Sequence, residues 1–137
     1  MIQTDLYKSI IRLLPIVYVD IVVKNTDGKF LLVKRKNNPL KGQWWVVGGR
    51  IEHMEKAQDA AKRKLKEEAD LEVKDLLFEG CYEDNFDNNA FDDVPYHTIS
   101  LIFSCIKDDS IDIKLDKQSS DWVWSEKLPD RFNYNRV

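Results

Sequence analysis

The segment from residue 48 to residue 71 constrains this chain most, because it places two adjacent carboxylates on a predicted helix directly after a pair of glycines. If residues 55–69 are helical, with about 100° of rotation per residue, Ala61 and Leu65 lie on an apolar stripe and Glu68 projects into it. An ionised group in an apolar environment costs several kcal/mol unless it is paired, hydrogen-bonded or bound to a cation. We therefore expect a metal site where this helix meets the glycines.

The spacing within this segment resembles the Nudix box, a glycine followed by a glutamate and then by Arg-Glu-apolar-x-Glu-Glu-x-Gly-apolar. The chain departs from that pattern at Lys64, which replaces the glutamate after the arginine, and at Asp70, which replaces the last glycine. Asp70 can adopt the left-handed geometry that ends a helix. Lys64, in contrast, removes a carboxylate that many family members use for metal binding or water activation. The matching residues are Gly49, Glu55, Arg63, Leu65, Glu67, Glu68 and Leu71.

Length and composition indicate a single domain over residues 1–137, since 43% of the residues are hydrophobic and can bury a sizeable core. Cys81 and Cys105 lack the paired spacing of a zinc site or a disulfide framework, so we expect reduced thiols. We expect no signal peptide, and no apolar run approaches the roughly 18 residues of a spanning helix, so we expect a cytoplasmic protein with no membrane partner. The net charge of −3 argues against general nucleic-acid binding, whereas basic residues near the box, including Arg35 and Arg50, favour a small anionic ligand.

Hydrophobic periodicity and turn signals predict alternating helices and strands. Before the box we expect a helix over 5–13, strands over 16–24 and 29–36 paired through an Asp-Gly turn at 25–28, an apolar run at 44–47 and a tight turn at 48–49. After the box helix we expect strands over 76–82, 97–106 and 122–124, and a helix-like tail. We also expect a polar loop over 83–93 that serves as a flexible lid or a specificity loop. This order predicts an α/β fold with a mixed β-sheet sandwiched between α-helices, which is also the Nudix fold that the resemblance implies.

Beyond the box, the segment over 16–73 resembles the GDP-mannose mannosyl hydrolase branch of the Nudix superfamily. Asp20 in the first strand, Lys34-Arg35 in the second and Gly48-Gly49-Arg50 before the box carry this similarity. In that branch water attacks the anomeric carbon of the sugar and GDP leaves, whereas most Nudix enzymes cut a phosphoanhydride at phosphorus. The resemblance implies Mg²⁺-dependent hydrolysis of a nucleoside diphosphate sugar, with GDP-mannose as the best single candidate, and a homodimer formed through the N-terminal segment.

The resemblance also implies a set of site residues. Arg35 and Arg50 would bind the diphosphate with planar guanidinium groups, and Asp20 would contribute to substrate binding. Mg²⁺ would neutralise the charge that develops on the departing GDP. The implied metal ligands are the Gly49 carbonyl, Glu67, Glu68 and Gln118.

The general base is left open, because Ser119 stands where the branch has a histidine and a serine hydroxyl is a poor base. His97 could supply the base from a neighbouring strand, or Glu67 could activate a water molecule. The missing histidine and Glu67 favour a standard Nudix pyrophosphohydrolase that cleaves a phosphoanhydride of a nucleotide sugar or a nucleoside triphosphate. Lys64 together with Ser119 favours a further alternative, a catalytically weakened nucleotide-binding module.

Overall fold

The computed structural model describes residues 4–36, 40–86, 95–108, 113–115, 119–134 and 137. Its helices and strands form a mixed sheet with helices packed around it, which confirms the expected fold class. The elements are α1 (Thr4–Leu13), β1 (Ile16–Lys24), β2 (Phe30–Arg35), β3 (Trp44–Trp45), β4 (Val47–Arg50), α2 (Ala57–Ala69), β5 (Leu77–Phe86), β6 (Tyr96–Ile106), β7 (Ser119–Ser125) and α3 (Asp130–Tyr134).

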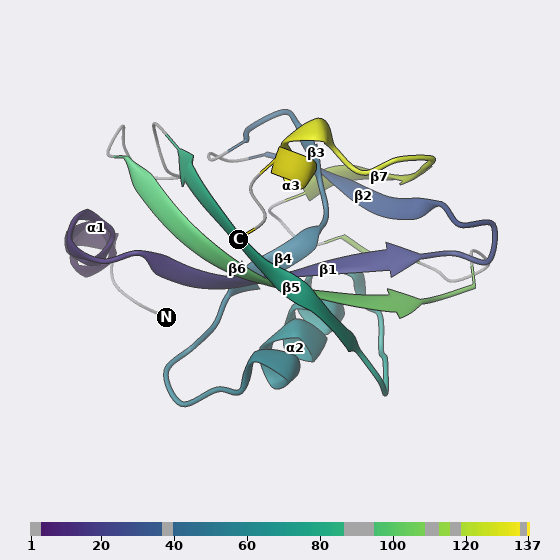
Figure 1. Cartoon of the computed structure of the whole chain (residues 1–137), viewed down its shortest axis with the longest axis horizontal. Coiled ribbons are helices and arrows are strands. Elements are labelled where there is room, and N and C mark those ends of the chain that lie inside the picture. The colour runs from purple at the N-terminus through teal and green to yellow at the C-terminus, as the bar shows by residue number, and fades with distance from the viewer. Residues whose placement is uncertain (1–3, 37–39, 87–94, 109–112, 116–118, 135–136) are drawn as a thin grey trace.

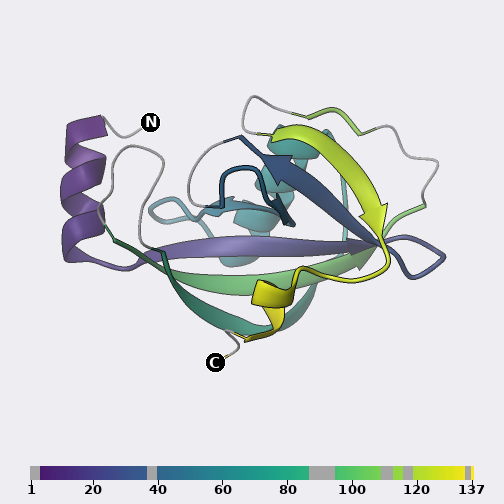
Figure 2. The same cartoon turned by 90° about the horizontal axis from the view of Figure 1, so that it is seen from above.

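Strand β1 is the centre of the sheet. The strands follow the order β3-β2-β1-β6-β5, with β4 also paired to β1 and β7 also paired to β2. Along its whole length β1 runs parallel to β6, from Ile16 opposite Thr98 to Lys24 opposite Ile106. Helix α2 covers one face of the sheet, α3 lies on the other side near β3, and α1 stands at one end (Figures 1 and 2).

Side chains of β1 alternate between two hydrophobic clusters on opposite faces of the sheet, as expected for an extended strand. Val19 and Ile21 are completely buried in the cluster that includes Leu65 of α2. Val22 belongs to the cluster on the other face, which contains Phe132 of α3. The alternation therefore directs Asp20, like Val22, away from α2.

The turn between β1 and β2 forms as predicted, but the strands separate immediately after it. The Asn25 Oδ1 atom accepts hydrogen bonds from the backbone N–H groups of Asp27 (3.0 Å) and Lys29 (2.9 Å). Beyond the single pair of Lys24 with Phe30, β2 is paired with β7, while β4 pairs with β1. The prediction that residues 29–36 return along β1 is therefore wrong after the first pair, because a turn determines only the residues next to it.

Gly48 and Gly49 lie inside β4, which corrects the predicted tight turn. They are needed for close approach rather than for a special backbone angle. A Cβ atom on Gly48 would lie 2.2 Å from Asp20 Oδ1 and 2.5 Å from the Val19 carbonyl oxygen. A Cβ atom on Gly49 would lie 2.2 Å from Cε of Lys64. The two glycines thus allow β4 to fit between β1 and α2.

The end of α2 confirms the expectation for Asp70. This residue has the left-handed angles φ 55° and ψ 38°, and its N–H donates to the Lys66 carbonyl at 3.1 Å. The bond from Asp70 to Lys66 is that of an αL helix ending, and the N–H of Leu71 donates to the Leu65 carbonyl at 3.2 Å. An aspartate therefore serves here in place of the glycine of the box.

Strand β5 is longer than the sequence predicts, whereas the cysteines match the prediction. Strand β5 continues to Phe86, so residues 83–86 are strand rather than loop, and residues 87–94 lie outside the described part. Cys81 and Cys105 are free thiols, as predicted. Among the described residues no helix has the length and apolar character needed to span a membrane.

Replacing Gly48 with alanine should destabilise the fold by about 2–3 kcal/mol, because the new methyl group would overlap both a carboxylate and a backbone carbonyl. Gly42→Ala is a suitable control, since its Cβ would enter open space and only its φ of 78° opposes the change. That variant should lose about 1 kcal/mol. Urea unfolding of both variants measures the difference. Equal losses would show that close packing is not the reason for glycine at position 48.

Candidate functional site

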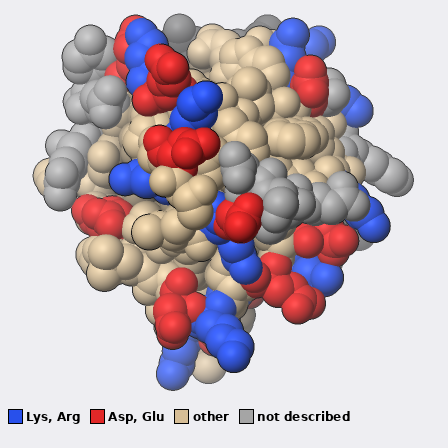
Figure 3. Space-filling model, turned by 90° about the vertical axis from the view of Figure 1, so that its right-hand side faces the viewer, with Lys and Arg blue, Asp and Glu red and all other residues tan. Residues whose placement is uncertain are grey.

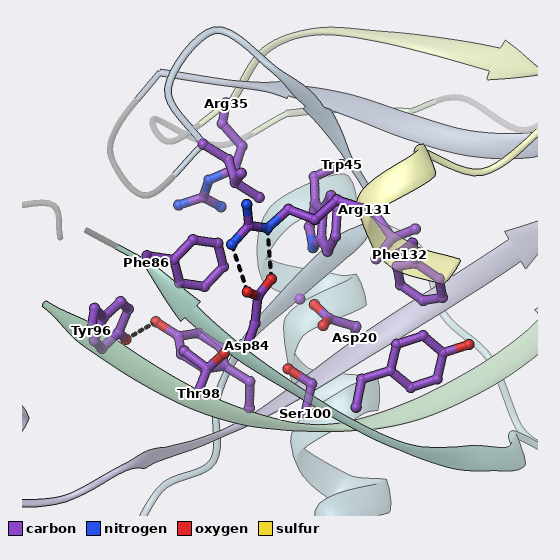
Figure 4. A pocket seen from close by; sticks show the side chains of 15 residues that line it. Asp20, Arg35, Trp45, Asp84, Phe86, Tyr96, Thr98, Ser100, Arg131 and Phe132 are labelled. Atoms are coloured by element: carbon purple, nitrogen blue, oxygen red, sulfur yellow. Dashed lines mark hydrogen bonds and ion pairs between the residues drawn. The ribbon is translucent and has the colours of Figure 1, made fainter. Parts of the chain in front are cut away.

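A cavity lies on the face of the sheet opposite α2 (Figure 4). Its floor is formed by alternate residues of β1 and β6, namely Asp20, Thr98 and Ser100. Its walls come from β2, β3, β5 and α3 and combine aromatic rings with two arginines. The principal wall residues are Arg35, Trp45, Phe86, Arg131 and Phe132.

One wall is fixed by Arg131 of α3. Its Nε donates to Asp84 Oδ2 at 2.7 Å and its Nη2 to Asp84 Oδ1 at 2.5 Å (Figure 4). The guanidinium carbon also lies 4.6 Å from the centre of the Phe86 ring. A two-point ion pair with an aromatic contact holds these side chains in one geometry. The wall therefore offers flat apolar surface beside fixed polar groups, which suits a planar heterocycle.

The floor of the cavity carries a carboxyl group that titrates near neutral pH. Asp20 is 7% exposed, and its burial raises its pKa from 3.8 to about 7. A hydrogen bond with Ser100 and the positive charge of Arg35 oppose this rise, whereas the negative charge of Glu68 adds to it. An acid with a pKa near neutrality can both accept and donate a proton under physiological conditions.

Gly48 connects the cavity floor to the carboxylates of α2. Its backbone N–H donates to Glu68 Oε2 at 3.3 Å, and it stands opposite Asp20 in the pairing of β4 with β1. Glu68 is buried, as the helical periodicity predicted, and is 6% exposed. The Lys64 ammonium lies 3.2 Å from Glu68 Oε1 and 3.3 Å from Glu67 Oε2.

Arg63 holds the loop of the box against α2. It donates through Nε to Glu55 Oε2 at 2.7 Å and through Nη2 to the Arg50 carbonyl at 3.0 Å. It also donates through Nη1 to Glu67 Oε2 at 3.2 Å. The hydrogen bond from Arg63 lowers the pKa of Glu55, so this carboxylate stays ionised. For Glu67, desolvation raises the pKa, but Arg63 and Lys64 outweigh it and leave the pKa lowered.

The predicted arginines occupy different positions. Arg35 lines the cavity, as its assignment to substrate binding requires. Arg50 is not among the residues that line it, and its guanidinium carbon lies 5.0 Å from the centre of the Tyr7 ring in α1. The Tyr7 hydroxyl is in turn 2.8 Å from that of Tyr96. Arg50 therefore lies at the rim, between the box and α1.

His97 is not among the residues that line the cavity, so its role as a base stays a prediction. Because side chains alternate along β6, Thr98 and Ser100 point into the cavity and His97 points to the other face. Its Nε2 atom lies 2.8 Å from Glu83 Oε2. Ser119 is buried in β7 opposite Arg35. Gln118 lies outside the described residues.

Sequence reasoning did not identify Asp84 and Arg131. Asp84 lay in the segment expected to be a loop, and its partner is distant along the chain. The alternation of Tyr82, Asp84 and Phe86 was the available signal, because all three line one wall of the cavity once residues 83–86 are treated as strand.

Glu67, Glu68 and the Gly49 carbonyl provide hard oxygen atoms of the kind that Mg²⁺ prefers. Within the described part of the chain, no group of three or more His, Cys, Asp or Glu residues could hold a metal ion. Glu67, Glu68 and the Gly49 carbonyl would therefore hold a divalent ion only together with water or ligand oxygens in its remaining positions. Such an ion would lie beside Gly48, where the cavity meets α2.

Charges of both signs are mixed on one face of the molecule. On the face shown in Figure 3, lysines and arginines alternate with aspartates and glutamates, so the described residues form no broad basic surface there.

Comparison with known proteins defines the family. A family model described as the NUDIX domain matches residues 14–131, so the chain belongs to the Nudix hydrolase family. An ADP-ribose pyrophosphatase of Methanocaldococcus jannaschii is 41% identical over 103 residues, which are 74% of this chain and 56% of the relative. The chain thus spans little more than half of that protein. The low-salt glycan biosynthesis protein Agl8 of Haloferax volcanii is 30% identical over 120 residues, or 87% of this chain and 76% of Agl8.

Solved structures support the same fold. The MutT protein of Methanosarcina mazei superposes with a TM-score of 0.72 at 22% identity, covering 86% of this chain and 88% of that one. At this identity the likeness concerns the fold, and the mixed sheet with flanking helices is common to both.

The raised pKa of Asp20 predicts a specific dependence of stability on pH. Between pH 3.8 and about 7 the folded chain holds a proton on Asp20 that the unfolded chain has lost, so folding stability should fall as pH rises through this window. Asp20→Asn removes that decline. We compare the free energy of unfolding of the variant with that of the parent at each pH. The difference, variant minus parent, should be about 2–4 kcal/mol larger at about pH 8 than at about pH 4.

Urea unfolding at both pH values measures this difference. Asp27→Asn, at an exposed turn, is the control and should keep the pH profile of the parent. If Asp20→Asn also follows the parental profile, Asp20 ionises normally in the folded protein.

Proposed function

We propose that this protein hydrolyses a nucleoside diphosphate sugar with the help of a divalent ion such as Mg²⁺. The observation that carries the proposal is the junction at Gly48, where a cavity with aromatic and arginine walls meets the buried carboxylate of α2. A single ligand can place its base in the cavity and its diphosphate over the junction. The names of two relatives agree with this substrate class, since one acts on ADP-ribose and the other belongs to glycan biosynthesis.

In this reaction the residues of the site would bind the diphosphate, hold the ion and accept a proton. Arg35 inside the cavity and Arg50 at its rim would donate hydrogen bonds to the diphosphate. Glu68, with Glu67 and the Gly49 carbonyl, would hold the ion, which supplies positive charge to the departing diphosphate. Asp20 would accept the proton of the attacking water. Asp84 also lines the cavity, but Arg131 holds it in an ion pair, so we assign the proton transfer to Asp20 instead.

For the bond that breaks, we favour attack at the anomeric carbon, with GDP-mannose giving GDP and mannose. Lys64 removes a carboxylate that many phosphorus-attacking Nudix enzymes use to hold several ions, and a single ion is better suited to holding a leaving group than to assembling an activated water at phosphorus. The general base in the cavity floor would then be Asp20, in place of the histidine missing at Ser119.

Cleavage of the phosphoanhydride is the second candidate. It is favoured by the 41% identity to a protein named ADP-ribose pyrophosphatase, and it would yield a nucleoside monophosphate and a sugar phosphate.

Product analysis in ¹⁸O-labelled water distinguishes the two reactions. The protein is incubated with Mg²⁺ and, separately, with GDP-mannose, ADP-ribose, other nucleotide sugars and nucleoside triphosphates, and the products are identified by mass. We expect turnover of a nucleotide sugar with the label in the sugar hydroxyl. Label in a phosphate group would establish the second candidate, and no turnover of any substrate would contradict both.

Activity should depend on Glu68. Glu68→Gln preserves the size of the side chain but removes the charge that faces the ion, so kcat should fall by roughly two to four orders of magnitude. Glu72→Gln, an equivalent change at an exposed residue just beyond α2, is the control and should retain full activity. Near-normal turnover of Glu68→Gln would remove the metal site from α2.

A further inference from the structure

The Lys64 side chain lies among the residues that would hold the divalent ion, yet the proposed reaction gives it no role. Its Nζ atom is 3.2 Å from Glu68 Oε1 and 3.3 Å from Glu67 Oε2. Its Cε and Nζ atoms lie 2.2 Å and 3.0 Å from the position that a Cβ on Gly49 would take. The ammonium group therefore rests over Gly49 and bridges both carboxylates.

Several features of the chain create this arrangement. Glu67 and Glu68 follow Lys64 by three and four residues, which places all three side chains on one surface of α2. Gly49 leaves room for the stem of the lysine, and any larger residue there would push the stem aside. The side chains of Lys64 and Glu68, taken without their backbones, are only 13% and 7% exposed, so solvent screens their interaction less than it screens a surface ion pair.

A divalent ion bound by Glu67 and Glu68 would need the same oxygen atoms that now contact the ammonium. Two cations a few ångströms apart repel each other, and the repulsion is larger in a partly desolvated site than in water. The lysine and the ion therefore cannot share the carboxylates in this geometry without a cost.

We propose that Lys64 is a built-in cation that competes with the divalent ion for Glu67 and Glu68. In the free protein the ammonium neutralises the two carboxylates, and the ion binds only as Lys64 moves away. The inference builds on the proposed function, which assigns the ion to these carboxylates, and adds that a residue of the chain itself keeps the affinity for the ion low.

Binding of Mn²⁺ in the absence of nucleotide tests this inference. Electron paramagnetic resonance of free Mn²⁺ gives the Kd for the parent and for Lys64→Met, a change that keeps an unbranched side chain over Gly49 but removes the charge. The variant should bind Mn²⁺ at least about tenfold more tightly. Lys64→Arg retains the charge and should stay within about threefold of the parent.

Lys66→Met is the matched control, because it removes the same charge from the same helix. Lys66 is more exposed and is paired with Asp70 and Glu72, away from the two carboxylates. It should alter the Kd by less than about twofold. Thermal melts verify that each variant is folded, and Lys64→Gln replaces Lys64→Met if the latter does not fold.

The inference is wrong if removal of the Lys64 charge leaves Mn²⁺ binding unchanged or weaker, or if Lys66→Met tightens binding equally. The binding assay is independent of catalysis. Tighter Mn²⁺ binding in a protein that hydrolyses no nucleotide sugar would therefore support the inference and contradict the proposed function. Hydrolysis of a nucleotide sugar, with Mn²⁺ binding that is not tightened by removal of the Lys64 charge, would support the proposed function and contradict the inference.

Discussion

The position of the site depends on the guanidinium group of Arg63. This single side chain contacts Glu55 in the loop of the box, the carbonyl of Arg50 at the end of β4 and Glu67 on α2. One exposed ion pair contributes little to stability, because ordering two flexible side chains offsets the attraction. Here several hydrogen bonds share the ordering of one arginine that is 25% exposed. The loop, the strand and the helix are thereby fixed relative to one another, and so are the carboxylates.

Buried acids lower the stability of the fold where β1, β4 and α2 meet. Asp20 is buried with its charged form disfavoured, Glu68 is buried nearby, and Gly48 fits between them without a side chain. Stability alone would favour apolar residues at such positions. A ligand that occupies the junction and contacts both acids would explain why Asp20 and Glu68 lie on either side of Gly48.

The sequence predicted those parts of the site that depend on local pattern. The period of α2 placed Glu68 on the buried side, the tolerance of aspartate for left-handed angles predicted the end at Asp70, and the apolar run over 16–24 matched β1. Non-local relationships could not be obtained in this way. The pairing of β2 with β7 and the contact of Asp84 with Arg131 join segments far apart in the chain. The side of the sheet on which His97 lies could not be predicted for a different reason, because a strand prediction without its register does not say which face a residue occupies.

Helix α1 has a consequence for the energetics of binding. It stands at the end of the sheet (Figure 2), and Ile11 is its one buried residue. A short helix with so little burial opens more readily than the core of a domain. Since the Tyr7 ring contacts Arg50, opening of α1 would remove this contact from the arginine. The local unfolding equilibrium of this helix therefore becomes a contribution to the affinity for any ligand that Arg50 contacts, although the helix itself does not line the cavity.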